Sequence, residues 1–249
     1  SLARFTLQRL LPLLLSRSET IVQNEDDARM ITAMGLDPRR INLIPGAGVD
    51  LNSFAPKPRS GGPMVVMLAS RMLWDKGIGE FVEAARRLRQ PSVRFVLAGM
   101  VDPHNPSGIA TDQLQAWEQE GVIEWWGHQT DMVKCLNQAD VVCLPSYREG
   151  LPKVLLEAMA CARPCIATDV PGCRDAVTHG YNGLLVPVRD SIALGNAITK
   201  LLLDEDLRRR LGQCGRERVE KEFSVERVTK QTFEIYRRQL QWNAPVVSQ

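Results

Sequence analysis

Short apolar runs alternate with segments of helical periodicity along most of the chain, and this alternation constrains the fold more than any other feature. From residue 41 onward we predict strands at Ile41–Pro45, Val65–Ala69, Arg94–Ala98, Ile123–Trp126, Val141–Pro145, Cys165–Thr168 and Gly183–Val186. Helices are predicted at Ile78–Leu88, Lys153–Ala162, Ser191–Leu203, Asp204–Glu222 and Val225–Leu240. Strands that alternate with helices indicate βαβ units around a parallel sheet. Several runs are apolar at every position, which is typical of strands covered on both faces. The pattern predicts an α/β fold with a Rossmann-like parallel sheet and helices on both faces.

The first 35 residues follow a different pattern, with a predicted helix at Leu2–Leu15, a strand at Thr20–Gln23 and a helix at Asp26–Met34. This is too little chain for an independent domain. We therefore interpret residues 1–35 as the remnant of a preceding domain with its linker, and residues 36–249 as the main domain. The apolar run at 7–15 is interrupted by polar residues and a proline. It predicts an amphipathic helix that packs on a protein surface or touches lipid, and we favour the protein surface.

Composition excludes several classes of protein. The chain has 31 basic and 29 acidic residues, for a net charge of +2, which does not indicate a nucleic-acid binder. No run reaches the roughly 18 apolar residues that a membrane span needs. Six cysteines include no C-x-x-C pair, so we predict free thiols in a reducing cytoplasm. Zinc at Cys161 and Cys165 is the less favoured alternative, and no metal site is predicted.

The strongest local signal is the segment Pro145–Ala160, which reads PSYREGLPKVLLEAMA. It places the carboxylate of Glu149 and a glycine in the loop between a predicted strand and a predicted helix. Pro152 stands where the helix begins, and its missing N–H costs nothing there. The free N–H groups of the first turn form an anion site that the helix dipole strengthens. Gly150 allows a ligand to approach the backbone closely.

Glu157 lies inside the same helix among apolar neighbours, where a carboxylate is costly to bury without a partner. A pair of ribose hydroxyls is one such partner. Glu149 is placed to accept hydrogen bonds from sugar hydroxyls at the carboxyl end of the strand, where open α/β sheets bind ligands. These residues alone support equally well a plainer interpretation, in which Glu149 caps the helix and Glu157 lies on the surface.

Two cations, Arg71 and Lys76, occupy the loop between the strand at 65–69 and the helix at 78–88. Two cations at this edge suit a diphosphate, because arginine offers a planar fork and lysine a point charge. They can also stabilise the charge on a departing nucleoside diphosphate. The alternative is a solvated loop in which one of them pairs with Asp75.

Two glycine-containing loops are weaker signals. The loop at 45–50 reads PGAGVD and permits a tight turn near a ligand at Gly48, but a plain turn fits it equally well. The full G-x-G-x-x-G motif is absent, which disfavours a Rossmann dinucleotide site. Gly127 and His128 follow another predicted strand and can border a nucleobase, although a histidine in such a place is more often a loop residue.

Taken together, these motifs resemble the GT-B retaining glycosyltransferases of family 4, also called group 1. The central signature of that family is two glutamates separated by seven residues, here Glu149 and Glu157. The downstream pattern fits at CIATD (165–169), at Gly172 with Arg174 and Asp175, and at NGLLV (182–186). The similarity covers residues 41 to 240, which is most of the chain.

The resemblance implies the C-terminal half of a GT-B fold, with residues 36–249 as the nucleotide-sugar-binding domain and a last helix that crosses back to the preceding domain. Arg71 and Lys76 would contact the donor diphosphate and Glu149 the transferred sugar, and these three are the predicted catalytic residues. The other predicted donor contacts are Gly48, Gly127, His128, Gly150, Leu151, Pro152, Val154 and Glu157.

The reaction implied by the resemblance is a retaining transfer of a hexosyl or N-acetylhexosaminyl group from a nucleoside-diphosphate sugar, with UDP as the favoured nucleotide. The acceptor would be a glycan or a lipid-linked sugar in polysaccharide biosynthesis, and no metal or other cofactor is expected. The implied partners are the nucleotide sugar and an acceptor-binding N-terminal domain that this sequence lacks. We therefore expect donor binding with little or no transfer, in the cytoplasm, with peripheral contact at the inner face of the membrane as an option.

One departure and two alternatives accompany this interpretation. Ala162 stands where the family often has glycine, and we expect it only to tighten helix packing. A non-catalytic nucleotide-binding module is an alternative, but such a module need not retain Arg71, Lys76 and both glutamates. An isomerase or phosphorylase on the same fold is another, although the chain shows no lysine context for pyridoxal phosphate.

Overall fold

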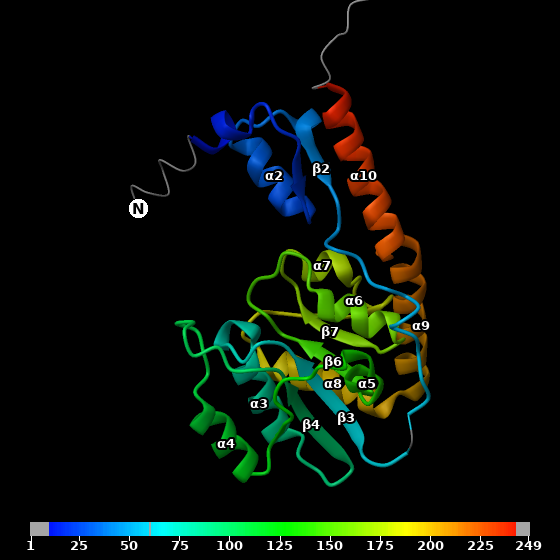
Figure 1. Ribbon diagram of the computed structural model, residues 1–249. Coiled ribbons are helices and arrows are strands. Elements are labelled where there is room, and N and C mark those ends of the chain that lie inside the picture. The colour runs from blue at the N-terminus through cyan, green and yellow to red at the C-terminus, as the bar shows by residue number, and fades with distance from the viewer. Residues whose placement is uncertain (1–9, 60, 243–249) are drawn as a thin grey trace, which may run out of the picture.

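The computed structural model describes residues 10–59 and 61–242, which form two units with separate sheets (Figure 1). The larger unit is built on six parallel strands in the order β5-β4-β3-β6-β7-β8. These strands are β3 (Met64–Ala69), β4 (Val93–Ala98), β5 (Glu124–Trp125), β6 (Val141–Leu144), β7 (Cys165–Thr168) and β8 (Gly183–Val186). The strand order reverses between β3 and β6. The carboxyl ends of strands beside such a reversal border the crevice in which open α/β sheets bind ligands.

Helices cover both faces of this sheet, as predicted. One face carries α3 (Ile78–Arg87), α4 (Thr111–Gln119) and α8 (Ser191–Leu203), and the other carries α5 (Met132–Asn137) and α6 (Lys153–Ala160). Successive residues of β3 point to opposite faces: Val65 and Met67 join the core beneath α6, whereas Val66 and Leu68 join the core beneath α3. Both cores are apolar, which explains why the strand lacks hydrophobic alternation.

The smaller unit contains β1 (Thr20–Val22) and β2 (Ile41–Leu43), paired in parallel, with α2 (Glu25–Ala33) and the short η1 (Pro38–Arg40) beside them. The strand predicted at Ile41–Pro45 therefore pairs with β1 and does not join the six-stranded sheet. Residues 10–15 are helical, and the rest of the helix predicted at Leu2–Leu15 lies outside the described residues. Among the described helices, none has the length and apolar character to cross a membrane.

The last helix, α10 (Val225–Trp242), returns from α9 (Glu205–Glu222) to run along the smaller unit (Figure 1). Its residues Val228 and Ile235 bury against Ile44.

The chain crosses between the units twice, and the two crossings are hydrogen-bonded to each other. The N–H of Val49 donates to the carbonyl of Phe223 at 2.9 Å, and the N–H of Val225 donates to the carbonyl of Val49 at 3.0 Å. Gly48 has φ +75°, and a Cβ there would lie 2.7 Å from the Cα of Val225. Glycine at 48 therefore permits the two segments to approach each other.

Local patterns predicted most elements within one or two residues, and β7, β8 and α8 match their predicted ranges. Three helices were missed: α4, α5 and the short α7 (Cys173–Ala176). With 6 and 4 residues, α5 and α7 are too short for apolar periodicity to show.

The end of α6 corrects the expectation for Ala162. Its φ is +53°, and it follows the helix instead of packing within it. The N–H of Ala162 donates to the carbonyl of Met159 at 2.8 Å, and the N–H of Arg163 donates to that of Ala158 at 2.9 Å. This pair of bonds is a Schellman motif, whose left-handed residue is usually glycine because a Cβ is strained there.

Replacing Ala162 by glycine should therefore stabilise the chain by about 1 kcal/mol, because relief of the left-handed strain exceeds the entropy that glycine adds to the unfolded chain. Urea unfolding of both proteins, with equal m-values, measures the difference. A lower midpoint for Ala162→Gly would show that the left-handed conformation carries no strain.

Candidate active site

Two adjoining cavities lie over the carboxyl ends of the strands, and Arg71 lines both. The smaller has a volume of about 310 Å³ and is bordered by the segments that follow β3, β4 and β5 and by α6. Its lining comprises Ala69, Ser70, Arg71, Ala98, Gly99, Met100, His128, Gln129, Met132, Val154 and Glu157. The cavity is mostly apolar with one buried carboxylate, a composition that suits a nucleoside.

That buried carboxylate belongs to Glu157, whose exposed fraction is 7%. The Nζ of Lys153, one turn earlier, lies 3.0 Å from its Oε1. The Lys153 side chain is 64% exposed, so this ion pair only partly compensates the burial. The surface position that the sequence left open for Glu157 is therefore wrong. A carboxylate held in a cavity can accept further hydrogen bonds from a ligand.

The larger cavity has a volume of about 910 Å³ and lies between the two units, since Asp26, Asp27 and Met30 of α2 line it together with residues of the larger unit. Lys76 and Glu149 meet there, with Nζ 2.6 Å from Oε1. Their side chains are 21% and 12% exposed, so the pair is only lightly screened by water. The sequence placed these two residues on separate loops, and the structure brings them into contact.

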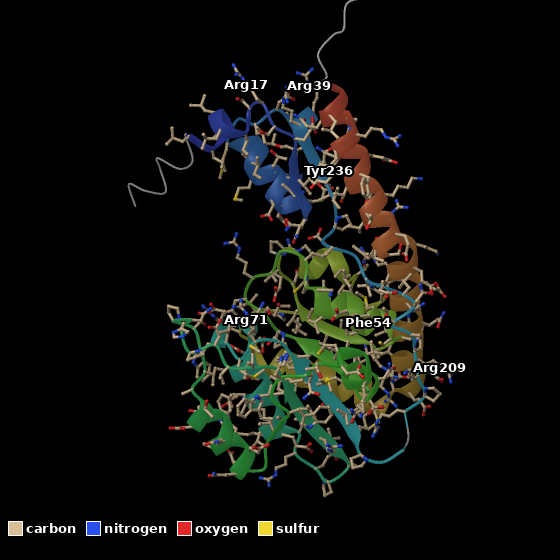
Figure 2. All side chains as sticks on the ribbon, in the orientation of Figure 1. Arg17, Arg39, Phe54, Arg71, Arg209 and Tyr236 are labelled. Atoms are coloured by element: carbon tan, nitrogen blue, oxygen red, sulfur yellow. The ribbon has the colours of Figure 1, made fainter. Side chains whose placement is uncertain are left out.

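Arg71 stands at the edge of the larger unit that faces the smaller one (Figure 2). Its Nη1 lies 2.9 Å from Oδ2 of Asp102, and the arginine side chain remains 57% exposed. The pairing with Asp75 that the sequence left open is not made, because Asp102, after β4, takes that place. With much of its guanidinium exposed, Arg71 can reach a ligand from either cavity.

The loop that carries Glu149 is fixed by backbone contacts. Nδ2 of Asn24, at the start of α2, donates to the carbonyl oxygen of Gly150 at 2.9 Å. On the other side, a Cβ at Gly172 would lie 2.2 Å from the same oxygen. Asn24 is 2% exposed and also caps α2 through Asp27. Sequence reasoning gave Asn24 no role, and its position before a run of acidic residues signalled only a helix cap.

The start of α6 offers donors to an anion. Pro152 is the N-cap residue, with φ −75°, and the helix begins at Lys153, as predicted. Within the described part of the chain, the backbone N–H groups of Lys153 and Val154 have no acceptor, whereas that of Leu155 donates to the carbonyl of Pro152. Unpaired N–H groups at a helix start are the donors that bind phosphate in other proteins.

The other predicted contacts are distributed unevenly. His128 and Val154 line the smaller cavity and Gly150 the larger one, whereas Gly48, Gly127, Leu151 and Pro152 line neither. Gly127 accepts a hydrogen bond from the N–H of Gly99, a cavity residue, at 2.7 Å. Gly48 lies at the crossing between the units, and Leu151 is buried in the core beneath α6. Their roles as donor contacts stay predictions.

Tyr147 extends the larger cavity beyond Glu149. Its hydroxyl donates to Oε1 of Glu80 at 2.8 Å. Burial raises the pKa of Tyr147, and the hydrogen bond to Glu80 raises it further, whereas Arg189 acts in the opposite direction. The phenol therefore stays protonated at neutral pH and serves as a donor and an apolar surface.

The six cysteines are free thiols, and all but Cys214 are buried. Burial raises the pKa of Cys135 and of Cys161 to about 11 and that of Cys173 to about 12, where Glu149 adds to the shift. In residues 10–59 and 61–242, no cluster of three or more His, Cys, Asp or Glu side chains could hold a metal ion.

Alkylation of the native chain at pH 8 should therefore modify Cys214 alone, because a buried thiol with a raised pKa supplies little thiolate. Mass spectrometry of intact protein should show one adduct, and six after denaturation. Several adducts on the folded chain would contradict the buried positions of the other thiols.

Solved structures with the GT-B fold are similar to this chain. Sucrose-phosphate synthase from Thermosynechococcus elongatus aligns with a TM-score of 0.83 and 29% identity, over 96% of this chain and 63% of that one. Anabaena HepE in complex with UDP aligns with a TM-score of 0.82 and 22% identity, over 92% and 66%. These alignments confirm the predicted fold class.

Curated relatives are similar in sequence. The α-1,3-N-acetylgalactosaminyltransferase of Campylobacter jejuni that acts on N,N'-diacetylbacillosaminyl-diphospho-undecaprenol is 32% identical over 86% of this chain. The α-maltose-1-phosphate synthase of Mycolicibacterium smegmatis is 36% identical over 83% of it. The chain spans 59% of the length of each. The model of the family Glycosyl transferases group 1 matches residues 50–218, more than half of the sequence, and the chain belongs to this family.

Proposed function

We propose that this chain is the donor-binding, C-terminal part of a retaining glycosyltransferase of family 4, and that its donor is a UDP-sugar. The observation that carries the proposal is the pair of adjoining cavities, with Glu157 in one, Glu149 in the other and Arg71 lining both. A nucleotide sugar is elongated, with a nucleoside at one end, a sugar at the other and a diphosphate between them. It would place one end in each cavity and the diphosphate beside Arg71. The complex of HepE with UDP supports the choice of nucleotide.

In this proposal Glu157 accepts hydrogen bonds from the ribose, and the segment of Gly127 and His128 borders the base. Arg71, Lys76 and the free N–H groups of Lys153 and Val154 bind the diphosphate. Glu149 binds hydroxyls of the transferred sugar. Backbone atoms of the loop from Gly150 to Pro152 lie along the sugar, and the turn at Gly48 lies close to the donor.

Chemically, the site would stabilise the departing diphosphate by positive charge, and the leaving phosphate would help to deprotonate the acceptor. Glu149 then positions the sugar and stabilises charge, and neither a metal ion nor another cofactor takes part. The transferred group would be a hexosyl or N-acetylhexosaminyl unit. The acceptor would be a glycan or a lipid-linked sugar, at the cytoplasmic side of a membrane.

Residues 1–35, extended by β2, would then be the end of an acceptor-binding N-terminal domain. Helix α2, which would belong to that domain, lines the larger cavity. Because most of the acceptor site would lie in the rest of that domain, we expect this chain alone to bind donor with little or no transfer.

Calorimetric titration of this chain with UDP, GDP and ADP should show binding of UDP. The affinity for UDP-glucose or UDP-N-acetylglucosamine should equal or exceed the affinity for UDP. Replacing Glu157 by glutamine should lower the affinity for UDP by about tenfold, because the ribose loses a charged hydrogen-bond acceptor. The same substitution should change the affinity for 2',3'-dideoxy-UDP little, since that ligand has no ribose hydroxyls to lose.

Glu234→Gln, an exposed substitution on α10 outside both cavities, is the matched control and should bind UDP as the native chain does. Folded protein that binds none of the three nucleotides would contradict the proposed function. Equal weakening of UDP and its dideoxy analogue by Glu157→Gln would remove Glu157 from the ribose contact.

A further inference from the structure

Arg189 adopts a backbone conformation that arginine has no intrinsic reason to adopt. Its φ is +58°, and among the described residues only Ala162 shares a left-handed φ without being glycine. Arg189 directly precedes Asp190, whose carboxylate caps α8. Glycine would fit this turn without strain. Arginine instead of glycine at this left-handed position raises the question of what its side chain contacts.

The side chain of Arg189 extends over the ring of Tyr147, with its Cζ 4.6 Å from the ring centroid. Tyr147 is held from its other end by the hydrogen bond to Glu80. In this stacked arrangement the flat face of the guanidinium lies against the ring. The N–H donors around the edge of the guanidinium remain available to a carboxylate or a phosphate. The ring therefore acts as a platform that holds an arginine fork in one orientation.

Both residues line the larger cavity, and neither lines the smaller one. The smaller cavity is bordered by segments that follow β3, β4 and β5, whereas Arg189 follows β8, the strand at the opposite edge of the sheet. The side chain of Arg189 reaches back from the end of β8 to Tyr147, which follows β6, so the guanidinium lies beside the loop that carries Glu149.

The charges of the larger cavity are only partly paired. Lys76 binds Glu149, Arg71 binds Asp102, and Asp26 binds Arg29 and Arg174. Within the described part of the chain, four charged residues of the lining form no ion pair: Arg148, Arg189, Asp27 and Asp75, of which Asp27 accepts a hydrogen bond from Asn24. Arg148 and Arg189 are the described cations of this lining that no acidic side chain pairs with, and their N–H donors remain available to an anion other than the donor diphosphate.

We propose that Arg189, stacked on Tyr147 and assisted by Arg148, binds an anionic group of the acceptor, a phosphate or a carboxylate. This inference rests on the proposed function, because that function assigns the diphosphate of the donor to Arg71 and Lys76. It adds a substrate class: the acceptor carries negative charge next to the hydroxyl that receives the sugar. The left-handed backbone at position 189 is the conformation that carries the side chain to the platform.

The test uses this chain saturated with UDP, so that the donor diphosphate site is filled. Methyl phosphate is then titrated at constant ionic strength and its binding followed by phosphorus NMR. Glycine and asparagine both tolerate the left-handed conformation. Replacing Arg189 by either of them should lower the affinity for methyl phosphate by about tenfold or more. The affinity for UDP should stay unchanged, and the melting temperature should not fall.

Ala162→Gly is the matched control, because it relieves the same backbone strain at a site outside the cavity. It should leave methyl phosphate binding unchanged. UDP-loaded native chain that binds no methyl phosphate, or binds it equally after both Arg189 substitutions, would overturn the inference while leaving the proposed function intact. A fall in melting temperature in both variants would indicate a structural role for Arg189 and would also overturn it.

A second arm separates the acceptor from the donor. UDP-glucose and UDP-glucuronate are titrated into native chain and Arg189→Gly, and each should bind the two proteins equally. If Arg189→Gly lowered the affinity for UDP-glucuronate but not that for UDP-glucose, Arg189 would bind an anionic group of the transferred sugar. That result would overturn the acceptor assignment. Failure of UDP itself to bind the native chain would overturn the proposed function, and this inference with it.

Discussion

Replacing Lys76 by alanine is expected to weaken UDP binding by about a hundredfold, equivalent to about 3 kcal/mol. The substitution removes a cation that the proposed function places against the diphosphate. It also leaves the carboxylate of Glu149, now 2.6 Å from Nζ, without its partner and facing the incoming anion. Calorimetric titration of UDP into native and variant chains measures the loss.

The double variant Lys76→Ala with Glu149→Gln separates the two causes, because it removes the lone carboxylate as well. It should recover about tenfold of the lost affinity if repulsion by Glu149 carries half of the effect. Lys200→Ala, an exposed substitution on α8 outside both cavities, should bind UDP normally. Native affinity in Lys76→Ala would exclude Lys76 from the diphosphate contact.

Replacing Gly77 by alanine is expected to destabilise the fold by about 3 kcal/mol or more. Gly77 has φ +71°, and a Cβ there would lie 2.1 Å from the carbonyl oxygen of Pro145. This contact joins the start of α3 to the end of β6, so the backbone at one of them must shift. Urea unfolding measures the loss, and UDP binding should weaken too, since Gly77 follows Lys76 directly.

Gly180→Ala provides the comparison. Gly180 has φ +77°, but no atom lies within 4 Å of a Cβ built there. It should therefore cost only the left-handed strain, about 1 kcal/mol. Equal destabilisation by the two substitutions would mean that the contact with Pro145 relaxes freely and that the close approach of α3 to β6 is not required.

The parts of the fold that the sequence predicts are those that local patterns encode. The strand at 165–168 and the helix at 191–203 show their apolar character within a few residues of chain. The meeting of Lys76 with Glu149 was foreseeable in outline. Both loops follow strands whose carboxyl ends lie at one edge of a parallel sheet, and that topology follows from the alternation of strands and helices.

Other features depend on contacts between distant segments, which no local pattern records. The bond from Asn24 to Gly150 joins residues 126 positions apart. Likewise, β2 has the composition of a strand, but nothing within it specifies β1 as its partner in place of the six-stranded sheet. The left-handed φ of Ala162 was missed because the residue at that place in a Schellman motif is usually glycine and alanine gives no signal of it.

The paired crossing at Val49 has a mechanical consequence. Two connections that run side by side and share hydrogen bonds cannot bend independently. A rotation of the smaller unit would bend both connections together at residues 48–49 and 223–225, and it would also have to break the bond from Asn24 to Gly150. The coupling depends on one residue, since any side chain at position 48 would push the two connections apart at Val225.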